Sequence, residues 1–290
     1  IMAKASLYTQ EMIEKYTGAG YWENITLSDI WERNARQYPD KEAIVDSRNR
    51  LTWAGAKIWI DRLALGLLEL GLKRDEVVVI QLPPCVESIL LRLACERAGL
   101  LHLPVLRTLR HTEMTHVLGY TEAKAIIMPW KYRDFDYLDM VREMKPNLPH
   151  LKHIIIWGED VPKGTLALKD LLNTPLEKKY PRDYLESKKM PPLEFSMIGI
   201  TTGTTGLPKF VESPICSLTV IGKGNPRLKI RSDDIIPVTT GAALGPNVPA
   251  LNMGIHVGAK IVVLEHWTAE EGLKMIEKEK VTLPSLVPTQ

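Results

Sequence analysis

The sequence has few residues that could bind zinc or form disulfides. Its 290 residues include three cysteines, Cys85, Cys95 and Cys216, which form no C-x-x-C pair. The seven histidines form no H-E-x-x-H or H-x-x-E-H pattern, so we predict no metal ion held by protein side chains. Oxidising compartments favour paired cysteines, and an odd, widely spaced set is typical of buried, reduced thiols. The cysteine content therefore predicts a cytoplasmic protein.

Long apolar runs are also absent. No stretch approaches the ~20 consecutive apolar residues that are needed to span a bilayer. Residues 1–16, IMAKASLYTQEMIEKY, contain no apolar core of the kind that a secretory signal peptide requires. We predict neither an integral membrane segment nor a signal peptide.

Neither sign of charge dominates. Thirty-seven Lys and Arg face 35 Asp and Glu, for a formal net charge of +2. A phosphate backbone requires a dense basic face, and no stretch supplies one. The lysines at 178, 179, 188 and 189 alternate with acidic residues, as in a solvated connection. Nucleic acid is therefore not the expected partner.

The sequence does contain a regular alternation of strand and helix patterns. Val77–Ile80 is a continuous apolar run, which is typical of a parallel strand buried on both faces. Further strands are predicted at 101–105, 125–128 and 154–156, with helices at 86–98, from 112 through 118, and at 137–144. Before them, a helix beginning at Thr26 or Ser28, a hairpin of 43–46 with 51–53, and a helix over 58–70 are expected. The fold class is therefore α/β, with parallel sheets built from βαβ units and helices on both faces.

The length predicts about two structural units. Residues 173–194 are rich in Pro, Lys and Glu with little periodicity, which indicates a surface connection with room for a short helix. We therefore expect a first α/β subdomain at 1–172 and a second α/β segment at 195–290. In the second segment, strands are predicted at 195–201, 235–238 and 258–264, and a charged amphipathic helix at 269–280.

One ordered motif stands out, T-T-G-T-T-G-L-P-K at Thr201–Lys209. Two glycines allow backbone conformations in which amides converge on an anion, the threonines add hydroxyl donors, and Lys209 adds a positive charge. A strand just before the motif would hold it at the carboxyl edge of a sheet, where α/β proteins bind ligands. The motif predicts a clamp for the β- and γ-phosphates of a nucleotide; a flexible Thr/Gly turn is the alternative. It is not a Walker loop, because the G-x-x-x-x-G-K-[ST] spacing is absent and Pro208 precludes a helix there.

This ordered string closely resembles the phosphate-binding signature of the adenylate-forming superfamily, which comprises acyl- and aryl-CoA synthetases, firefly luciferase and the adenylation domains of non-ribosomal peptide synthetases. Further similarities follow in the family's order along the chain. They lie at 43–45 with 51–53, at 71–79, at 81–83, at 280–282 and at 287–289, while 135–137 with 148–155 is most similar to stand-alone enzymes that activate aryl acids. The resemblance implies the N-terminal part of the adenylate-forming enzyme fold.

It also implies a reaction in which a carboxylic acid and ATP form an acyl-adenylate and pyrophosphate, followed by transfer of the acyl group to a thiol. ATP, Mg²⁺ and CoA are the implied cofactors. The residues expected on the phosphates are Thr201, Thr202, Gly203, Thr204, Thr205, Gly206 and Lys209. Thr204 and Lys209 are expected to act catalytically, because charge develops on the leaving pyrophosphate.

The sequence departs from the family pattern at several positions. Phe210 stands where glycine is usual, and Ile215 stands near a frequent histidine. The next block carries neither the aromatic residue nor the histidine that is common near the acyl carboxylate. Its small residues predict a roomy, apolar acid pocket, with a simple strand-to-loop turn as the alternative. The residues of this predicted pocket are Thr240, Gly241, Ala242, Ala243 and Leu244.

The chain stops at Gln290, before the family's adenine-binding and ribose-binding blocks and its mobile C-terminal domain with the catalytic lysine. We therefore expect the N-terminal part of a longer enzyme, an acyl- or aryl-CoA ligase acting on a small carboxylic acid. Two alternatives stay open: an aryl-acid adenylating enzyme that loads a carrier protein, and a module that binds nucleotide or acid without turnover. A homodimer is an open alternative to a monomer.

Overall fold

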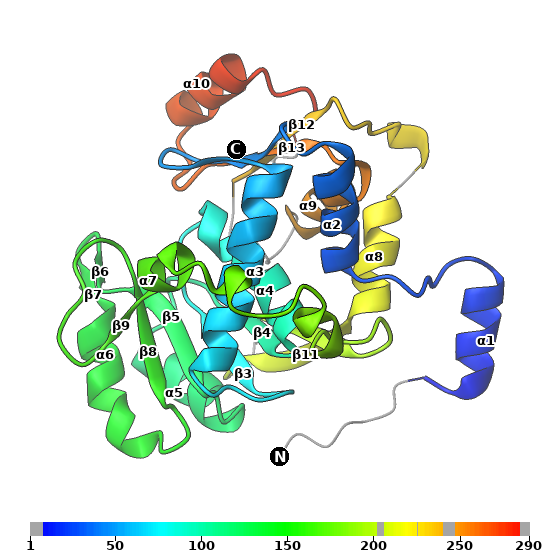
Figure 1. Cartoon of the computed structure of the whole chain (residues 1–290). Helices are drawn as coiled ribbons and strands as arrows, with labels where there is room; N and C mark the ends of the chain where they lie inside the picture. The colour runs from blue at the N-terminus through cyan, green and yellow to red at the C-terminus, as the bar shows by residue number, and fades with distance from the viewer. Residues whose placement is uncertain (1–7, 202–205, 225, 240–246, 285–290) are drawn as a thin grey trace.

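The computed structural model describes residues 8–201, 206–224, 226–239 and 247–284. Two sheets and their helices lie in five successive layers (Figure 1). Helix α10 covers the outer face of a four-stranded sheet. A middle layer of helices separates that sheet from a seven-stranded one, and α5 and α6 cover the far side. The predicted α/β class, with parallel strands and helices on both sheet faces, is confirmed.

The larger sheet has the strand order β11-β10-β4-β3-β5-β8-β9. Its members are β3 (Val77–Ile80), β4 (Leu101–Pro104), β5 (Ala125–Pro129), β8 (His153–Trp157), β9 (Leu166–Ala167), β10 (Phe195–Thr201) and β11 (Lys209–Pro214). Neighbouring strands are parallel, except that β11 is antiparallel to β10. The carboxyl ends of the parallel strands therefore meet at one edge.

The smaller sheet has the order β12-β13-β1-β2, and a separate two-stranded hairpin is made of β6 and β7. Their bounds are β1 (Glu42–Val45), β2 (Arg50–Thr52), β12 (Ile235–Val238), β13 (Lys260–Val263), β6 (Lys131–Tyr132) and β7 (Phe135–Asp136). Strand β13 is parallel to both β12 and β1, whereas β2 returns antiparallel to β1. The predicted hairpin is confirmed, but it ends at Thr52 rather than Trp53. The hydroxyl of Thr52 accepts a hydrogen bond from the Gly55 amide and begins the next helix there.

Six of the α-helices in the described residues were predicted from apolar periodicity, at 27–37, 53–69, 86–98, 111–120, 137–144 and 269–279, and four were not, at 10–18, 168–173, 215–223 and 247–257. The α-helices are α1 (Gln10–Gly18), α2 (Leu27–Gln37), α3 (Trp53–Glu69), α4 (Val86–Ala98), α5 (His111–Tyr120), α6 (Tyr137–Met144), α7 (Leu168–Asn173), α8 (Ile215–Lys223), α9 (Asn247–Val257) and α10 (Ala269–Glu279). Short 3₁₀ turns lie at Lys145–Asn147, Leu176–Lys178, Tyr184–Ser187 and Pro226–Leu228. Of the two predicted caps for α2, Thr26 is the one used, in a capping box with Asp29.

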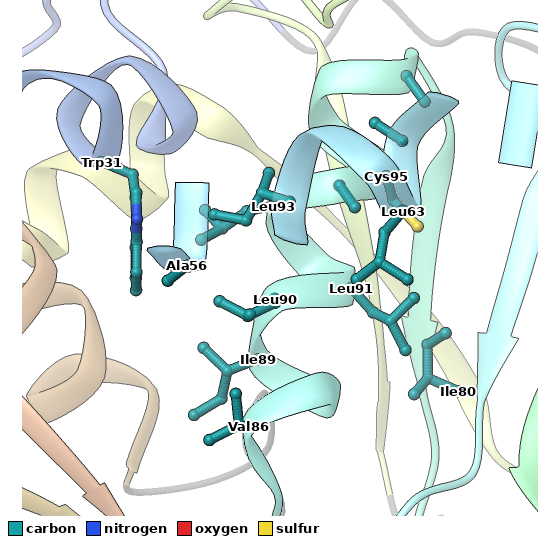
Figure 2. Packing of buried hydrophobic residues seen from close by; sticks show 14 of the residues in the cluster. Trp31, Ala56, Leu63, Ile80, Val86, Ile89, Leu90, Leu91, Leu93 and Cys95 are labelled. Atoms are coloured by element: carbon teal, nitrogen blue, oxygen red, sulfur yellow. The ribbon is translucent and has the colours of Figure 1, made fainter. Parts of the chain in front are cut away.

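Helix α4 is buried along its whole length in the middle layer. Figure 2 shows Val86, Ile89, Leu90, Leu91 and Leu93 of this helix among residues from α2 and α3. The helix ends at Gly99, whose φ of +72° is a left-handed conformation that favours glycine. A Cβ there would lie 2.5 Å from the Lys188 carbonyl oxygen, so this close approach also requires glycine.

Residues 173–194 carry two of the 3₁₀ turns and contribute three apolar side chains to the interior, Leu176, Leu185 and Met190. Each sheet combines strands from both sides of this segment. Strand β4 pairs with β10, and β1 pairs with β13. The division into 1–172 and 195–290 therefore stays a prediction.

Candidate active site

The motif joins the two antiparallel strands β10 and β11 at the end of the larger sheet, which form a hairpin. In the hairpin, Ile200 of β10 is opposite Phe210 of β11, and Thr201 is opposite Lys209. Strand β10 runs parallel to β4, with Met197 opposite His102. Thr201 therefore ends β10 at the carboxyl edge of the parallel strands, as the sequence predicts.

Three of the predicted phosphate-binding residues are described, and all three are exposed: Thr201, Gly206 and Lys209. Thr202, Gly203, Thr204 and Thr205 lie outside the described residues. Gly206 has a φ of +152° and no atom within 4 Å of the position a Cβ would take. A bound group could therefore approach its backbone closely. No acidic side chain in the described part of the chain pairs with the ammonium of Lys209, which leaves this cation available to a ligand.

Aromatic side chains from α5 hold the second stem of the hairpin. The Nε2 atom of His116 lies 3.1 Å from the carbonyl oxygen of Pro208. The ring of Phe210 stacks on Tyr120, with centroids 5.0 Å apart and planes 5° from parallel. His116 lies beside both rings. Phe210, where the family commonly has glycine, thus forms the contact between β11 and α5.

Two arginines that the sequence reasoning did not select lie in the loop after β4, at the same carboxyl edge. The Arg110 guanidinium packs 3.8 Å from the ring centroid of Phe135, and that of Arg107 lies 4.9 Å from the Tyr132 ring. The Gln81 amide donates to the carbonyl oxygens of Leu106 and Leu109 and so fixes this loop. The sequence signal was available as two arginines, in R-T-L-R, directly after a buried strand. They add positive charge to the edge that bears Lys209.

The predicted acid pocket falls outside the described residues: Thr240, Gly241, Ala242, Ala243 and Leu244. Its two flanks are described. Thr239 follows the carboxyl end of β12 and Asn247 begins α9, and both are buried.

A buried polar group connects α4 with α8 and α9. Arg92 donates from Nη1 to the Asn252 side-chain oxygen at 2.9 Å, and the Asn252 amide donates to the Leu218 carbonyl oxygen. Both ring nitrogens of the fully buried His102 lack a partner among the described residues. Burial and, to a smaller extent, the nearby Arg92 charge lower the pKa of His102 to about 3, so its ring is neutral. This group therefore fixes α9, the helix that follows the predicted acid pocket in the chain, against α4 and α8.

The cysteines agree with the sequence expectation of buried, reduced thiols. All three are free and buried. Burial raises the pKa of the Cys85 and Cys95 thiols, so neither is a ready thiolate nucleophile. In the part of the chain that the structure describes, no three His, Cys, Asp or Glu side chains are grouped as metal ligands. Across the same residues, no helix is both long enough and apolar enough to cross a bilayer.

Comparison with known proteins identifies the family. The family model described as AMP-binding enzyme matches residues 31–290. The chain belongs to this family. It is 28% identical over 287 residues to 2-hydroxy-7-methoxy-5-methyl-1-naphthoate–CoA ligase of Streptomyces carzinostaticus, covering 97% of this chain and 51% of that enzyme. It is 29% identical over 289 residues to the 2,3-dihydroxybenzoate-AMP ligase of Bacillus subtilis, with the same coverage of both chains.

A solved structure agrees with the fold as well. The apo structure of MbtA from Mycobacterium smegmatis superposes with a TM-score of 0.87 at 25% identity, covering 97% of this chain and 52% of that one. The AMP-binding family and its fold are therefore shown for this chain. The chain spans about half the length of the curated relatives it matches.

Proposed function

We propose that this chain supplies the phosphate-binding and acid-binding parts of an ATP-dependent acid–thiol ligase. The observation that carries the proposal is the Thr/Gly motif that follows β10 at the carboxyl edge of the larger sheet, in a chain matched by the AMP-binding family over residues 31–290. Beside it lies Lys209, which pairs with no acidic side chain among the described residues. The relatives include both CoA ligases and AMP ligases of aromatic acids, which supports this reaction class.

In the proposed reaction, an oxygen of the acid's carboxylate attacks the α-phosphorus of ATP. The bond from that phosphorus to the bridging oxygen of the leaving group breaks, giving acyl-adenylate and pyrophosphate. A thiol then attacks the acyl carbonyl, AMP leaves, and the thiol proton is released. Negative charge grows on the leaving phosphates in the first step, so donors placed there beforehand lower the barrier.

The motif has the donors that this step requires. Backbone amides beside Gly206 and the threonine hydroxyls would bind phosphate oxygens, and Lys209 would neutralise charge at the end of the turn. A bound Mg²⁺ would neutralise further phosphate charge.

For the acid we propose an apolar carboxylic acid, aromatic, alicyclic or fatty. Gly241, Ala242 and Ala243 carry small side chains without polar groups, which would provide space without polar partners. A substrate hydroxyl would then lose its hydration without replacement, at roughly 1–3 kcal/mol each. Because relatives include enzymes named for hydroxylated aromatic acids, this is the part of the proposal that a substrate panel must decide.

For the thiol acceptor we propose CoA, in line with the naphthoate–CoA ligase. A carrier protein is the second candidate, favoured by the relative named as a salicyl-AMP ligase and salicyl-S-ArCP synthetase from Mycobacterium tuberculosis. The cytoplasmic location stays a prediction. The oligomeric state stays open between a monomer and a homodimer.

The test is acid-dependent exchange of pyrophosphate into ATP, measured on the whole protein with a panel of acids. We expect benzoate-like or medium-chain acids to give a higher kcat/KM than a dihydroxybenzoate. Ala242→Trp should lower kcat/KM for the bulky acids by filling the pocket, with Ala269→Trp at an exposed position of α10 as the control. A preference for the dihydroxylated acid would refute the apolar pocket. If none of the acids in the panel supports pyrophosphate exchange, acid activation itself would be refuted.

A further inference from the structure

Helix α5, which lies outside the motif, contacts the hairpin through the residues on either side of Lys209. His116 and Tyr120 are one helical turn apart on α5, so their side chains lie on one face of the helix. Both contact residues that flank Lys209, His116 at the Pro208 carbonyl and Tyr120 at the Phe210 ring. Lys209 is thus held from both sides by a helix that is about 90 residues away in the chain.

Helix α5 is a rigid support for this contact. Its opposite face buries Met114, Val117 and Leu118 against the larger sheet. The helix also begins immediately after the loop that carries Arg107 and Arg110. One rigid element therefore sets the position of two groups of positive charge, the arginine loop at its start and Lys209 across its exposed face.

The hydrogen bond also requires a hydrogen on Nε2 of His116. The Pro208 carbonyl oxygen can only accept, so Nε2 must donate its hydrogen. Because Pro208 has no amide hydrogen, its carbonyl is the backbone group through which the helix can hold this residue. The ring stack then restrains the residue after Lys209.

We propose that His116 and Tyr120 are positioning residues that fix Lys209 for the phosphates of ATP. This inference rests on the proposed function and deepens it, since it assigns part of the nucleotide site to a helix outside the motif. Neither side chain needs to contact the nucleotide. Their effect passes through the Pro208 carbonyl and the Phe210 ring.

The variants separate this role from a general loss of stability. His116→Ala removes the hydrogen bond, whereas His116→Gln keeps a donor that can reach the same oxygen. Tyr120→Ala removes the ring stack, whereas Tyr120→Phe keeps it. Tyr120 is 64% exposed, so its replacement should leave the core intact. The matched control is His111→Ala, because His111 is an exposed histidine of the same helix that pairs instead with Glu143.

Two readouts are needed. In pyrophosphate exchange by the whole protein, His116→Ala and Tyr120→Ala should each raise the KM for ATP about 3- to 10-fold and leave the KM for the acid unchanged. His116→Gln, Tyr120→Phe and His111→Ala should resemble the wild type. In hydrogen exchange on this chain, the same two alanine variants should speed exchange in residues 206–211.

The outcomes separate the inference from the function on which it rests. If Lys209→Ala lowers kcat/KM while His116→Ala and Tyr120→Ala change neither the KM for ATP nor hydrogen exchange, the positioning role is refuted and the phosphate site stands. If Lys209→Ala has no effect on kcat/KM, the phosphate site itself is refuted, and with it any role of α5 in catalysis. An equal rise in the KM for ATP and for the acid would indicate a merely structural role and would also overturn the inference.

Discussion

At the scale of single residues, Lys209 and the threonines before it supply different kinds of donor. A lysine provides a full positive charge on a flexible stem, and a threonine provides one hydroxyl at short range. Lys209 is exposed and unpaired within the described residues, so its charge is not used to stabilise the fold. Its removal should therefore affect phosphate binding far more than stability.

Lys209→Ala and Thr204→Ala should each lower the rate of pyrophosphate exchange in the whole protein. Removing one preplaced donor from a developing negative charge commonly costs about 10²–10³ in rate. Lys278→Ala, which removes an exposed lysine from α10, is the control and should leave the rate unchanged. Wild-type rates in both motif variants would refute the phosphate clamp.

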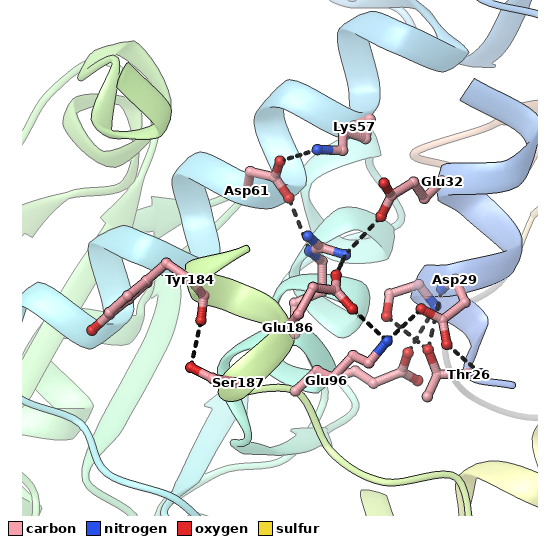
Figure 3. A network of polar contacts seen from close by, with 12 residues as sticks. Thr26, Asp29, Glu32, Lys57, Asp61, Glu96, Tyr184, Glu186 and Ser187 are labelled. Carbon is pink, nitrogen blue, oxygen red and sulfur yellow. Dashed lines mark hydrogen bonds and ion pairs between the residues drawn. The ribbon is translucent and has the colours of Figure 1, made fainter. Parts of the chain in front are cut away.

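At the scale of elements, a single buried arginine joins four of them. The side chain of Arg97 on α4 is 4% exposed. Its Nε lies 2.9 Å from Oδ1 of Asp61 on α3, and Nη1 lies 3.3 Å from Glu32 on α2. Glu186, in the turn at Tyr184–Ser187, is 3.5 Å from the same Nη1. Asp61, Glu32 and Glu186, labelled in Figure 3, all surround this guanidinium.

Arg97→Met should destabilise the protein by about 2–3 kcal/mol. Removing one partner of a buried ion pair typically costs ~3–5 kcal/mol. The expected loss is smaller here because Glu32 and Glu186 can be hydrated and Lys57 still pairs with Asp61. Urea unfolding would measure the change. Arg74→Met, which removes an exposed pair with Glu194, should cost less than ~1 kcal/mol. Equal losses in the free energy of unfolding of the two variants would contradict the claim that burial makes the Arg97 ion pairs more stabilising than the exposed pair.

A second network joins α10 to the smaller sheet and makes stability depend on pH. Hydrogen bonds from Arg50, opposed by burial and assisted by Lys260, lower the pKa of Glu279 from 4.5 to about 2. Because the folded-state pKa lies below the unfolded value, the stabilisation is complete above pH 4.5 and is lost as the pH falls toward 2. Glu279→Gln should therefore cost on the order of 2 kcal/mol near neutral pH, and this difference should shrink through that window. If the difference in the free energy of unfolding between the wild type and Glu279→Gln did not change with pH, the proposed ionisation of Glu279 would be refuted.

At the scale of the whole molecule, local patterns predicted most of the central helices and strands but not which of them are neighbours, and they missed α1, α8, α9 and the antiparallel strand β11. Val86–Ala98 followed from apolar periodicity and the glycine that ends it, and the buried strand at 77–80 followed from its apolar run. The pairing of β1 with β13, and of β10 with β4, joins segments far apart in the chain. Such pairings depend on packing of the whole core, which no short window of sequence contains.

The same distinction applies to the candidate site. The ordered Thr/Gly string and its place at the carboxyl edge could be predicted, because the preceding strand and the glycines are local features. The contact of His116 with Pro208 could not be predicted, because it depends on how α5 packs beside the hairpin. Arg107 and Arg110 lie between these cases. Their position after a buried strand is local, but their approach to aromatic rings of the β6–β7 region is tertiary.

The last prediction concerns the 290-residue chain on its own. It spans about half the length of its curated relatives. Complete closure of an active site around both substrates should therefore require more of the family's fold. We expect this chain, with ATP, Mg²⁺, CoA and the acid panel, to form no acyl-CoA above background, since each proposed group would bind phosphate or acid without the remaining catalytic groups. Mass spectrometry of the products would measure this, with the whole protein as the positive control. Acyl-CoA formed by this chain and lost in Lys209→Ala would mean that these residues contain the complete catalytic site.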